Sequence, residues 1–68
     1  MRVLKRAMDN KGNLVRLIME TNIETNWNKF YVEVFKDNQL NHEYLFTLLR
    51  PAEKYYHIKL LELNKNDL

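Results

Sequence analysis

The only glycine of the chain, Gly12, stands between two segments in which apolar and polar residues alternate. Residues 9–13, Asp-Asn-Lys-Gly-Asn, are typical of a tight turn, because these residue types tolerate the positive φ angles that such turns require. The flanking segments, 3–8 and 14–21, have the period of two that places alternate side chains on opposite faces of a strand. The sequence therefore predicts a β-hairpin at the start of the chain.

A third strand is predicted at 29–36, after a polar loop at 22–28 and before a turn at 37–41. Asparagine and threonine in the loop compete for backbone hydrogen bonds, which disfavours regular structure. Strand periodicity assigns the residues of the third strand to two faces. One face has Phe30, Val32 and Val34, and the other has Tyr31, Glu33 and Phe35. These elements form a three-stranded antiparallel meander.

Residues 42–63 allow two interpretations. In the first, strands at 43–49 and 55–63 are joined by a turn at Pro51, which gives a mainly β fold, a small antiparallel meander of about five strands that can close into a barrel. In the second, Asn41 caps a short helix and Pro51 opens another that runs to about residue 64, which gives an α+β fold with a three-stranded antiparallel sheet and a C-terminal helix. The run Tyr-Tyr-His-Ile at 55–58 favours the strand by propensity. Residues 64–68 are expected to form a tail.

The chain of 68 residues is expected to be one small domain, 1–68, because one hydrophobic core of this size only just outweighs the entropy of the chain. It has no cysteine, so disulfides cannot add stability, and a homodimer stays an open alternative. Secreted domains of this size usually contain disulfides, which favours a cytoplasmic location. No apolar segment is long enough to span a bilayer, so no membrane partner is expected.

The chain lacks the residue patterns that catalysis and cofactor binding need. It has neither cysteine nor serine as a nucleophile, and one glycine is too few for a phosphate-binding loop. The only histidines, His42 and His57, do not have metal-ligand spacing with Glu43. We therefore expect no enzyme activity, no cofactor and no metal.

The register of the first hairpin suggests a binding surface. A three-residue loop at 10–12 would pair Arg6 with Arg16 and Leu4 with Ile18, and would place Arg2 opposite Glu20. Like charges that face each other destabilise a sheet unless an acidic group lies near them. The other hairpin face is the expected core side, with Val3, Ala7, Val15, Leu17 and Met19. Of the aromatic residues, Phe30, Phe46 and Tyr56 are expected inside and Trp27, Tyr31 and Tyr55 outside.

These features favour a small binding protein that modulates a host protein, as an inhibitor or regulator, through direct protein–protein contact. Frequent asparagine and an excess of lysine over arginine suggest a low-GC bacterium, its phage or a mobile element, and hence the host cytoplasm. The alternative is a nucleic-acid-binding protein that uses the basic N-terminal hairpin and exposed aromatic side chains. The candidate partner-binding residues are Arg2, Leu4, Arg6, Lys11, Arg16, Ile18, Trp27 and Tyr31.

Overall fold

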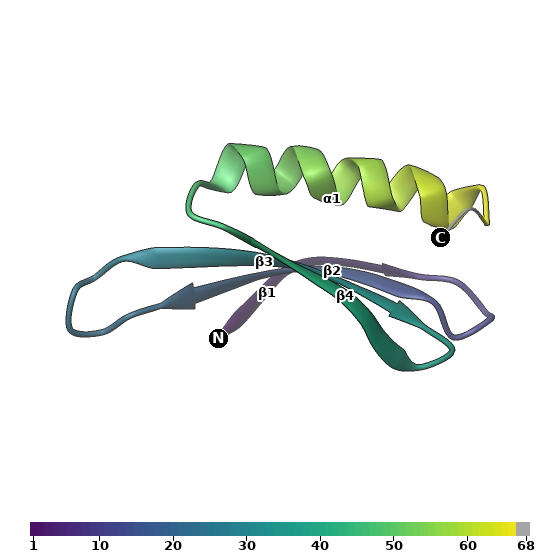
Figure 1. Ribbon diagram of the computed structural model, residues 1–68, viewed down its shortest axis with the longest axis horizontal. Coiled ribbons are helices and arrows are strands. Elements are labelled where there is room, and N and C mark those ends of the chain that lie inside the picture. Colours follow the sequence, from purple (N-terminus) through teal and green to yellow (C-terminus); the bar gives the residue numbers. More distant parts are fainter. Residues whose placement is uncertain (67–68) are drawn as a thin grey trace.

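The computed structural model describes residues 1–66 and consists of an open antiparallel sheet with a helix against one face (Figure 1). The elements are β1 (Arg2–Met8), β2 (Leu14–Thr21), β3 (Asn28–Lys36), β4 (Gln39–Phe46) and α1 (Leu49–Asn64). Neighbouring strands in the sheet are also neighbours in the sequence, in the order β1-β2-β3-β4. The predicted meander is confirmed. The barrel and the fifth strand are wrong, and the C-terminal helix of the α+β alternative is present on a sheet of four strands and not three.

The first turn has the predicted geometry. The backbone N–H of Asp9 donates to the carbonyl of Asn13 at 3.0 Å, and Gly12 has a φ of 86°. The Asp9 carboxylate accepts hydrogen bonds from the backbone N–H of Lys11 at 2.8 Å and of Asn13 at 3.0 Å. The turn therefore fixes the register, and Arg6 and Arg16 are opposite each other as predicted.

A β-bulge in β1 changes the register closer to the N-terminus. Val3 pairs with Ile18 and Lys5 with Leu17, so Leu4 is the extra residue. The bulge turns Leu4 toward the hydrophobic core and leaves Val3 exposed. The predicted pairs of Leu4 with Ile18 and of Arg2 with Glu20 are wrong, as is the placement of Val3 in the core. Bulges in edge strands disrupt the ladder, which protects an edge from further pairing.

The last strand of the β3–β4 hairpin begins earlier than the sequence suggested. Asp37 and Asn38 both have positive φ, 52° and 66°, which is the backbone of a two-residue type I′ turn. β4 therefore runs from Gln39 to Phe46. The predicted strand at 43–49 is confirmed for residues 43–46, the predicted turn at 37–41 is shorter and consists of Asp37 and Asn38, and the short helix after Asn41 is wrong. Asn41 is a second bulge, between the pairs of residues 34 with 42 and 35 with 40.

Helix α1 forms because its apolar residues recur with helical spacing and because Pro51 lies in its first turn, where no backbone N–H is needed. Ala52, Tyr56 and Leu63 are buried on one side of the helix. The predicted strand at 55–63 is wrong, because covering one face of the sheet outweighs the strand propensity of the aromatic run. Asn66, with a φ of 59°, follows the end of the helix, and residues 67–68 of the expected tail lie outside the described residues.

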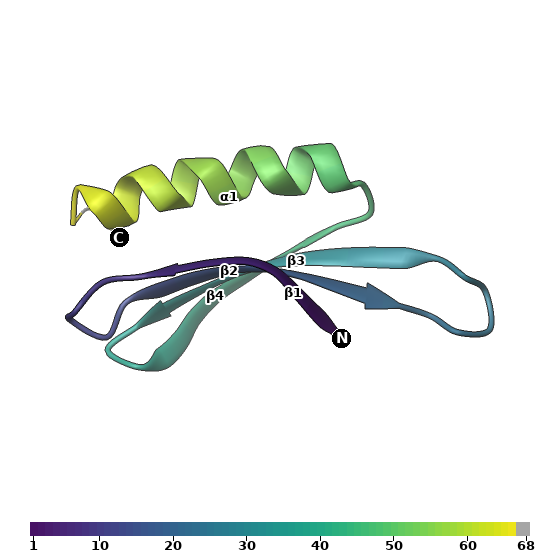
Figure 2. The same ribbon diagram turned by 180° about the vertical axis from the view of Figure 1, so that it is seen from behind.

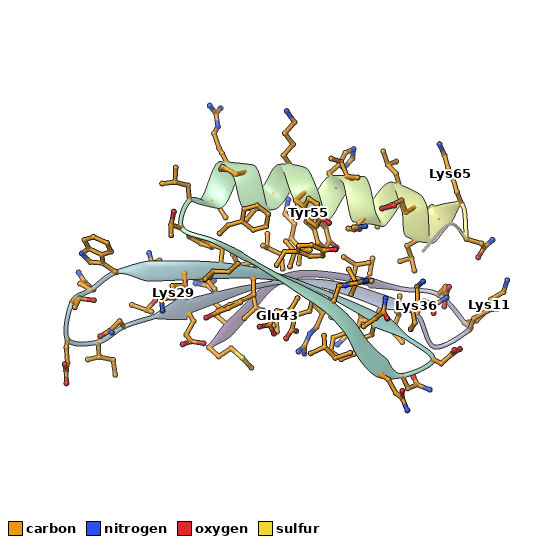
Figure 3. The ribbon with its side chains drawn as sticks, in the orientation of Figure 1. Lys11, Lys29, Lys36, Glu43, Tyr55 and Lys65 are labelled. Atoms are coloured by element: carbon orange, nitrogen blue, oxygen red, sulfur yellow. The ribbon has the colours of Figure 1, made fainter. Side chains whose placement is uncertain are left out.

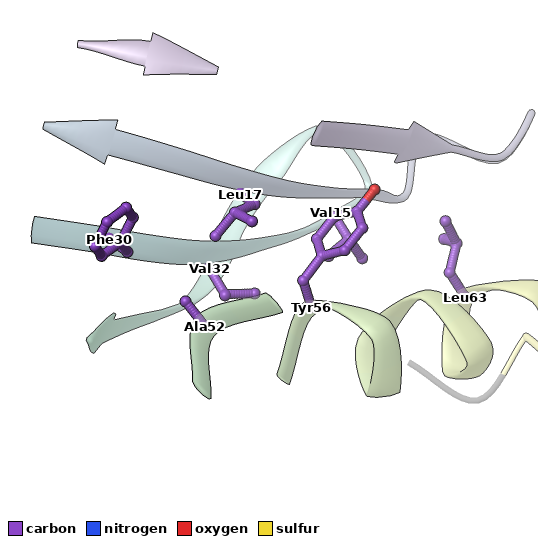
Figure 4. Close-up of a cluster of buried hydrophobic side chains, with 7 residues drawn as sticks. All are labelled: Val15, Leu17, Phe30, Val32, Ala52, Tyr56 and Leu63. Carbon is purple, nitrogen blue, oxygen red and sulfur yellow. The ribbon is translucent and has the colours of Figure 1, made fainter. Parts of the chain in front are cut away.

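The core lies between the helix and one face of the sheet (Figure 4). Its buried side chains are Val15 and Leu17 of β2, Phe30 and Val32 of β3, and Ala52, Tyr56 and Leu63 of α1. Phe30 and Tyr56 are buried as expected, and Phe46 packs against this cluster while partly exposed. Tyr55 also packs there, so its predicted exposure is wrong. The chain itself thus covers the central part of one face of the sheet with α1.

Candidate functional site

The face of the sheet opposite the helix is not covered by any element within residues 1–66 (Figures 1 and 2). Because directly paired residues of neighbouring strands share a face, this face is made of rows that run across all four strands. We call it the open face. Its rows, each read from β1 to β4, are Met8-Leu14-Phe35-Leu40, Arg6-Arg16-Glu33-Glu43 and Val3-Ile18-Tyr31-Leu45.

The middle row is charged and ordered by sign. Nε of Arg16 donates to Oε1 of Glu33 at 2.8 Å, and a second guanidinium nitrogen contacts the same oxygen. The Arg16 guanidinium also lies 5.2 Å from the centroid of the Phe35 ring. Among residues 1–66, Arg6 and Glu43 have no ion-pair partner. Glu43 lies on the side of the sheet away from the helix (Figure 3). The open face is therefore positive at the β1 edge and negative at the β4 edge.

The two flanking rows are apolar, and their outermost residues are well exposed. The exposed fractions are 41% for Val3, 60% for Met8, 51% for Leu40 and 57% for Leu45. Ile18 in a central strand is buried although it lies on this face. An apolar surface around a half-buried ion pair resembles the core of a protein interface more than a solvated surface.

A second exposed apolar surface lies at one end of the molecule, which we call the Trp27 tip and define by Ile23, Trp27 and Leu48. Their exposed fractions are 94%, 76% and 66%. Asn22 orders the loop, because its side-chain oxygen accepts hydrogen bonds from the backbone N–H of Glu24 at 2.9 Å and of Thr25 at 3.3 Å. The loop that carries Ile23 and Trp27 is therefore ordered by its own hydrogen bonds, and Leu48 lines the same surface hollow as Trp27.

The structure brings together four of the eight predicted site residues. Arg6, Arg16, Ile18 and Tyr31 are neighbours on the open face. The other four lie elsewhere, two because of the bulge in β1 and two because they lie outside the strands. Leu4 packs toward the core, Arg2 pairs with Met19 on the helix side of the β1 edge, Lys11 lies in the first turn and Trp27 is at the opposite end of the sheet.

Sequence reasoning missed the half of the site that comes from β3 and β4. Glu33 and Phe35 were assigned to the correct side of their strand, but the predicted strand at 43–49 began too late to include Leu40, and its residues were not assigned to a face. The missed residues on β4 are Leu40, Glu43 and Leu45. The signal that predicts them is the pair Asp37-Asn38, since Asp and Asn tolerate the two positive φ angles of a tight hairpin turn.

The titratable side chains near the helix form a separate cluster. The rings of Tyr44 and Tyr55 have centroids 4.6 Å apart, and Nζ of Lys59 lies 5.5 Å from the Tyr55 centroid. Burial, followed by a hydrogen bond with Tyr44, raises the pKa of Tyr55. Burial disfavours the charged amine of Lys59, but a hydrogen bond with Glu62 and the nearby Tyr55 outweigh this effect and raise its pKa. Tyr55 therefore keeps its phenolic proton, and Lys59 its positive charge, to a higher pH than usual.

The imidazoles do not converge. His42 pairs with Val34 and Glu43 with Glu33, so these adjacent residues point to opposite faces, and His57 is exposed on α1. Within residues 1–66, no three histidine, cysteine or acidic side chains are grouped to hold a metal ion.

No family model matches this sequence, and no curated protein or solved structure is significantly similar to it. In the part of the chain that the structure describes, no helix has the length and apolar character needed to cross a membrane. Any account of function therefore depends on the surfaces themselves.

Proposed function

We propose that this chain is a non-enzymatic binding protein that acts by direct protein–protein contact through the open face. The observation that carries the proposal is the pattern of that face, two apolar rows on either side of an ordered ion pair between Arg16 and Glu33. Interfaces bury apolar side chains around a few oriented polar groups. The Trp27 tip supplies a second anchor, because an exposed tryptophan on an ordered loop has much apolar area to bury.

A nucleic-acid partner is the weaker alternative, because two of the five basic side chains of the hairpin already have acidic partners and because acidic residues share the open face. Arg16 is paired with Glu33, and Nζ of Lys5 lies 3.5 Å from the carboxylate of Glu53. Glu33 and Glu43 share the open face with the arginines and would repel phosphate groups. Tyr31 and Phe35 are the aromatic residues of the open face. Both belong to β3, a central strand of the sheet. These features favour a protein partner over a polyanion.

The biological setting that fits this proposal is that of a small accessory factor from a phage or mobile element. Such a factor would work in the host cytoplasm and would inhibit or regulate a host protein. Its support is the composition, with frequent asparagine and an excess of lysine over arginine, together with the small β-rich domain. The two exposed surfaces at different places on the domain also suit a protein that acts by contact.

The test is capture of a protein from a lysate of a low-GC bacterium. The immobilised wild type is compared with variants on the two exposed surfaces and with a control variant on α1. We expect Leu45→Asp on the open face and Trp27→Ala at the tip to lose the captured protein. Lys54→Asp, on the exposed side of α1, should retain it. Capture should also survive high salt, since apolar contacts are screened little. Equal capture by Leu45→Asp, Trp27→Ala and Lys54→Asp would overturn the proposal.

A parallel titration addresses the alternative. Labelled single-stranded and duplex DNA and RNA are added to the protein at low and at physiological salt, and binding is followed by fluorescence anisotropy. Binding that weakens steeply with salt and is lost in Arg6→Glu would favour the nucleic-acid function. We expect no such binding.

A further inference from the structure

We infer that the protein that covers the open face is a second copy of this chain, which packs face to face about a two-fold axis parallel to the strands. This inference rests on the proposed function, since both take the open face as a protein-contact surface. Its basis is that the open face is complementary to itself in only one orientation.

The charged row selects that orientation. Its order is Arg6-Arg16-Glu33-Glu43, two cations on one half of the sheet and two anions on the other. A two-fold axis that lies in the interface and runs along the strands, between β2 and β3, reverses this order in the facing copy. Arg6 then faces Glu43 of the second copy, and Arg16 faces its Glu33. Each unlike pair occurs twice, as an isologous contact requires.

The same axis matches the apolar rows. Rotation about this axis does not change the position of a residue along the strand direction. Each apolar row of one copy therefore faces the same row of the second copy. In one row Met8 faces the second copy's Leu40, and in the other Val3 faces its Leu45. These four residues are exposed in the single chain. Sheets that pack face to face with their strands nearly aligned are a common arrangement, with side chains interdigitating between layers about 10 Å apart.

Other arrangements of two copies fit less well. An axis across the strands would place Arg6 on Arg6 and Glu43 on Glu43, and like charges at an interface are unfavourable. Pairing through a sheet edge is hindered on both sides, because the edge strands have bulges at Leu4 and Asn41. A sheet edge is thus a poorer surface for a homodimer than the open face.

The size of the face predicts a dimer of modest affinity. With strands about 4.8 Å apart and rows about 6.8 Å apart, three rows on four strands cover roughly 400 Å² in projection on each copy. The two copies together would contribute about 800 Å², which is below the range of stable specific interfaces and typical of weak, transient contacts. We therefore expect a dimer in exchange with monomer at micromolar concentrations. The Trp27 tips of both copies would lie at the same end, because the axis runs along the strands, and two tips at one end would remain available to another protein.

Charge exchange tests the orientation. Sedimentation equilibrium of the wild type should give a concentration-dependent dimer. Arg6→Glu and Glu43→Arg should each weaken dimerisation by about tenfold or more, since each creates two like-charge contacts. The double variant Arg6→Glu/Glu43→Arg should return to within about threefold of the wild-type constant, because the unlike pairs are restored. An equimolar mixture of the two single variants should form a heterodimer for the same reason. Lys54→Glu, which makes the same charge change as Arg6→Glu on the helix, should have no effect.

Disulfide crosslinking gives an independent measurement, since the chain has no cysteine of its own. Val3 and Leu45 are on the two edge strands, about 14 Å apart across three strand spacings, which is too far for a disulfide within one chain. The variant Val3→Cys/Leu45→Cys should form a covalent dimer on mild oxidation, whereas Val3→Cys alone should form no covalent dimer.

The outcomes separate this inference from the proposed function. A monomer at millimolar concentration, crosslinking by Val3→Cys alone, or no recovery in the charge-exchange double variant would overturn the dimer. Capture of a host protein that still depends on Leu45 and on Trp27 would then leave the proposed function standing. Loss of both the dimer and the variant-dependent capture would overturn both.

Discussion

Arg16 and Glu33 face each other on the two central strands, and the guanidinium directs two nitrogens to one carboxylate oxygen. The pair does more than add one contact, because Arg6 lies directly opposite Arg16 on the other side. Glu33 therefore offsets a repulsion between two arginines that the first hairpin creates by its own register. This explains how the sheet tolerates like charges in β1 and β2.

The first prediction concerns this pair. Glu33→Gln should lower the free energy of unfolding of the monomer by about 1 kcal/mol, since the ion pair is only partly exposed and Arg16 loses its counter-charge. A double-mutant cycle with Arg16→Gln should give a coupling of about 1 kcal/mol. Both values come from urea unfolding at low protein concentration. Glu43→Gln is the matched control and should change stability by less than about 0.5 kcal/mol. Equal losses from the two substitutions would contradict the role of the pair.

The second prediction concerns the contact between the β1–β2 turn, which contains Gly12, and the β3–β4 turn, which contains Asn38. The backbone N–H of Asn38 donates to the carbonyl of Gly12 at 2.9 Å. Gly12 has a φ of 86°, and a Cβ there would lie 3.2 Å from the Asn38 side-chain amide. Gly12→Ala should therefore lower the free energy of unfolding by about 1 to 2 kcal/mol, from backbone strain and from crowding.

The two causes can be separated with a second substitution. Asn38→Gly keeps the positive φ of the second turn accessible and removes the crowded side chain. In that background, Gly12→Ala should cost less than in the wild type, and the remaining loss measures the backbone strain alone. An identical loss in both backgrounds would show that the approach of the two turns has no energetic consequence.

The local features of the fold were predictable from the sequence. The first hairpin depends on residues within one turn, where Asp9 and Gly12 determine the geometry, and so the pairing of Arg6 with Arg16 followed correctly. The alternation in β3 placed Val32 and Glu33 on opposite faces, as the structure has them. Period two is a strong signal when one face is covered and the other is not.

The non-local features were not predictable in the same way. The bulge at Leu4 has no mark in the sequence, because it depends on how β1 meets β2 and the core. The aromatic run that begins at Tyr55 has strand propensity, yet it becomes helical because α1 buries Tyr56 and its neighbours against the sheet. The acidic half of the open face could be recognised only if the start and the register of β4 were known. Without that register, Glu43 was considered only as a metal ligand and not as an interface residue.

The third prediction compares leucines on the two faces of the sheet. Leu17 is fully buried beneath the helix, whereas Leu45 is 57% exposed on the open face. Leu17→Ala should lower the free energy of unfolding by about 3 kcal/mol, because it removes buried area and leaves a cavity. Leu45→Ala should change it by less than about 0.5 kcal/mol when the protein is monomeric. Chemical denaturation at low concentration measures both, and similar losses would mean that the open face is covered within the single chain.

The fourth prediction concerns alkaline pH. The pKa of Tyr55 is raised above its ordinary 10.0, mainly by burial, and the pKa of Lys59 is raised above 10.5 by its hydrogen bond with Glu62 and its neighbours, against the effect of burial. A group whose pKa is higher in the folded state stabilises that state below its unfolded pKa, and this contribution is lost as the pH rises through the folded value. Both groups therefore act in the same direction.

Thermal unfolding should accordingly have a constant midpoint from about pH 7 to 9 and a falling one above about pH 10. Burial also raises the pKa of Tyr56, so Tyr55→Phe removes one of three groups that contribute in this way and should make the alkaline fall shallower. Circular dichroism melts across this range provide the measurement. A midpoint that stays constant up to pH 11, or a slope that Tyr55→Phe leaves unchanged, would show that the cluster beneath α1 does not link folding to deprotonation.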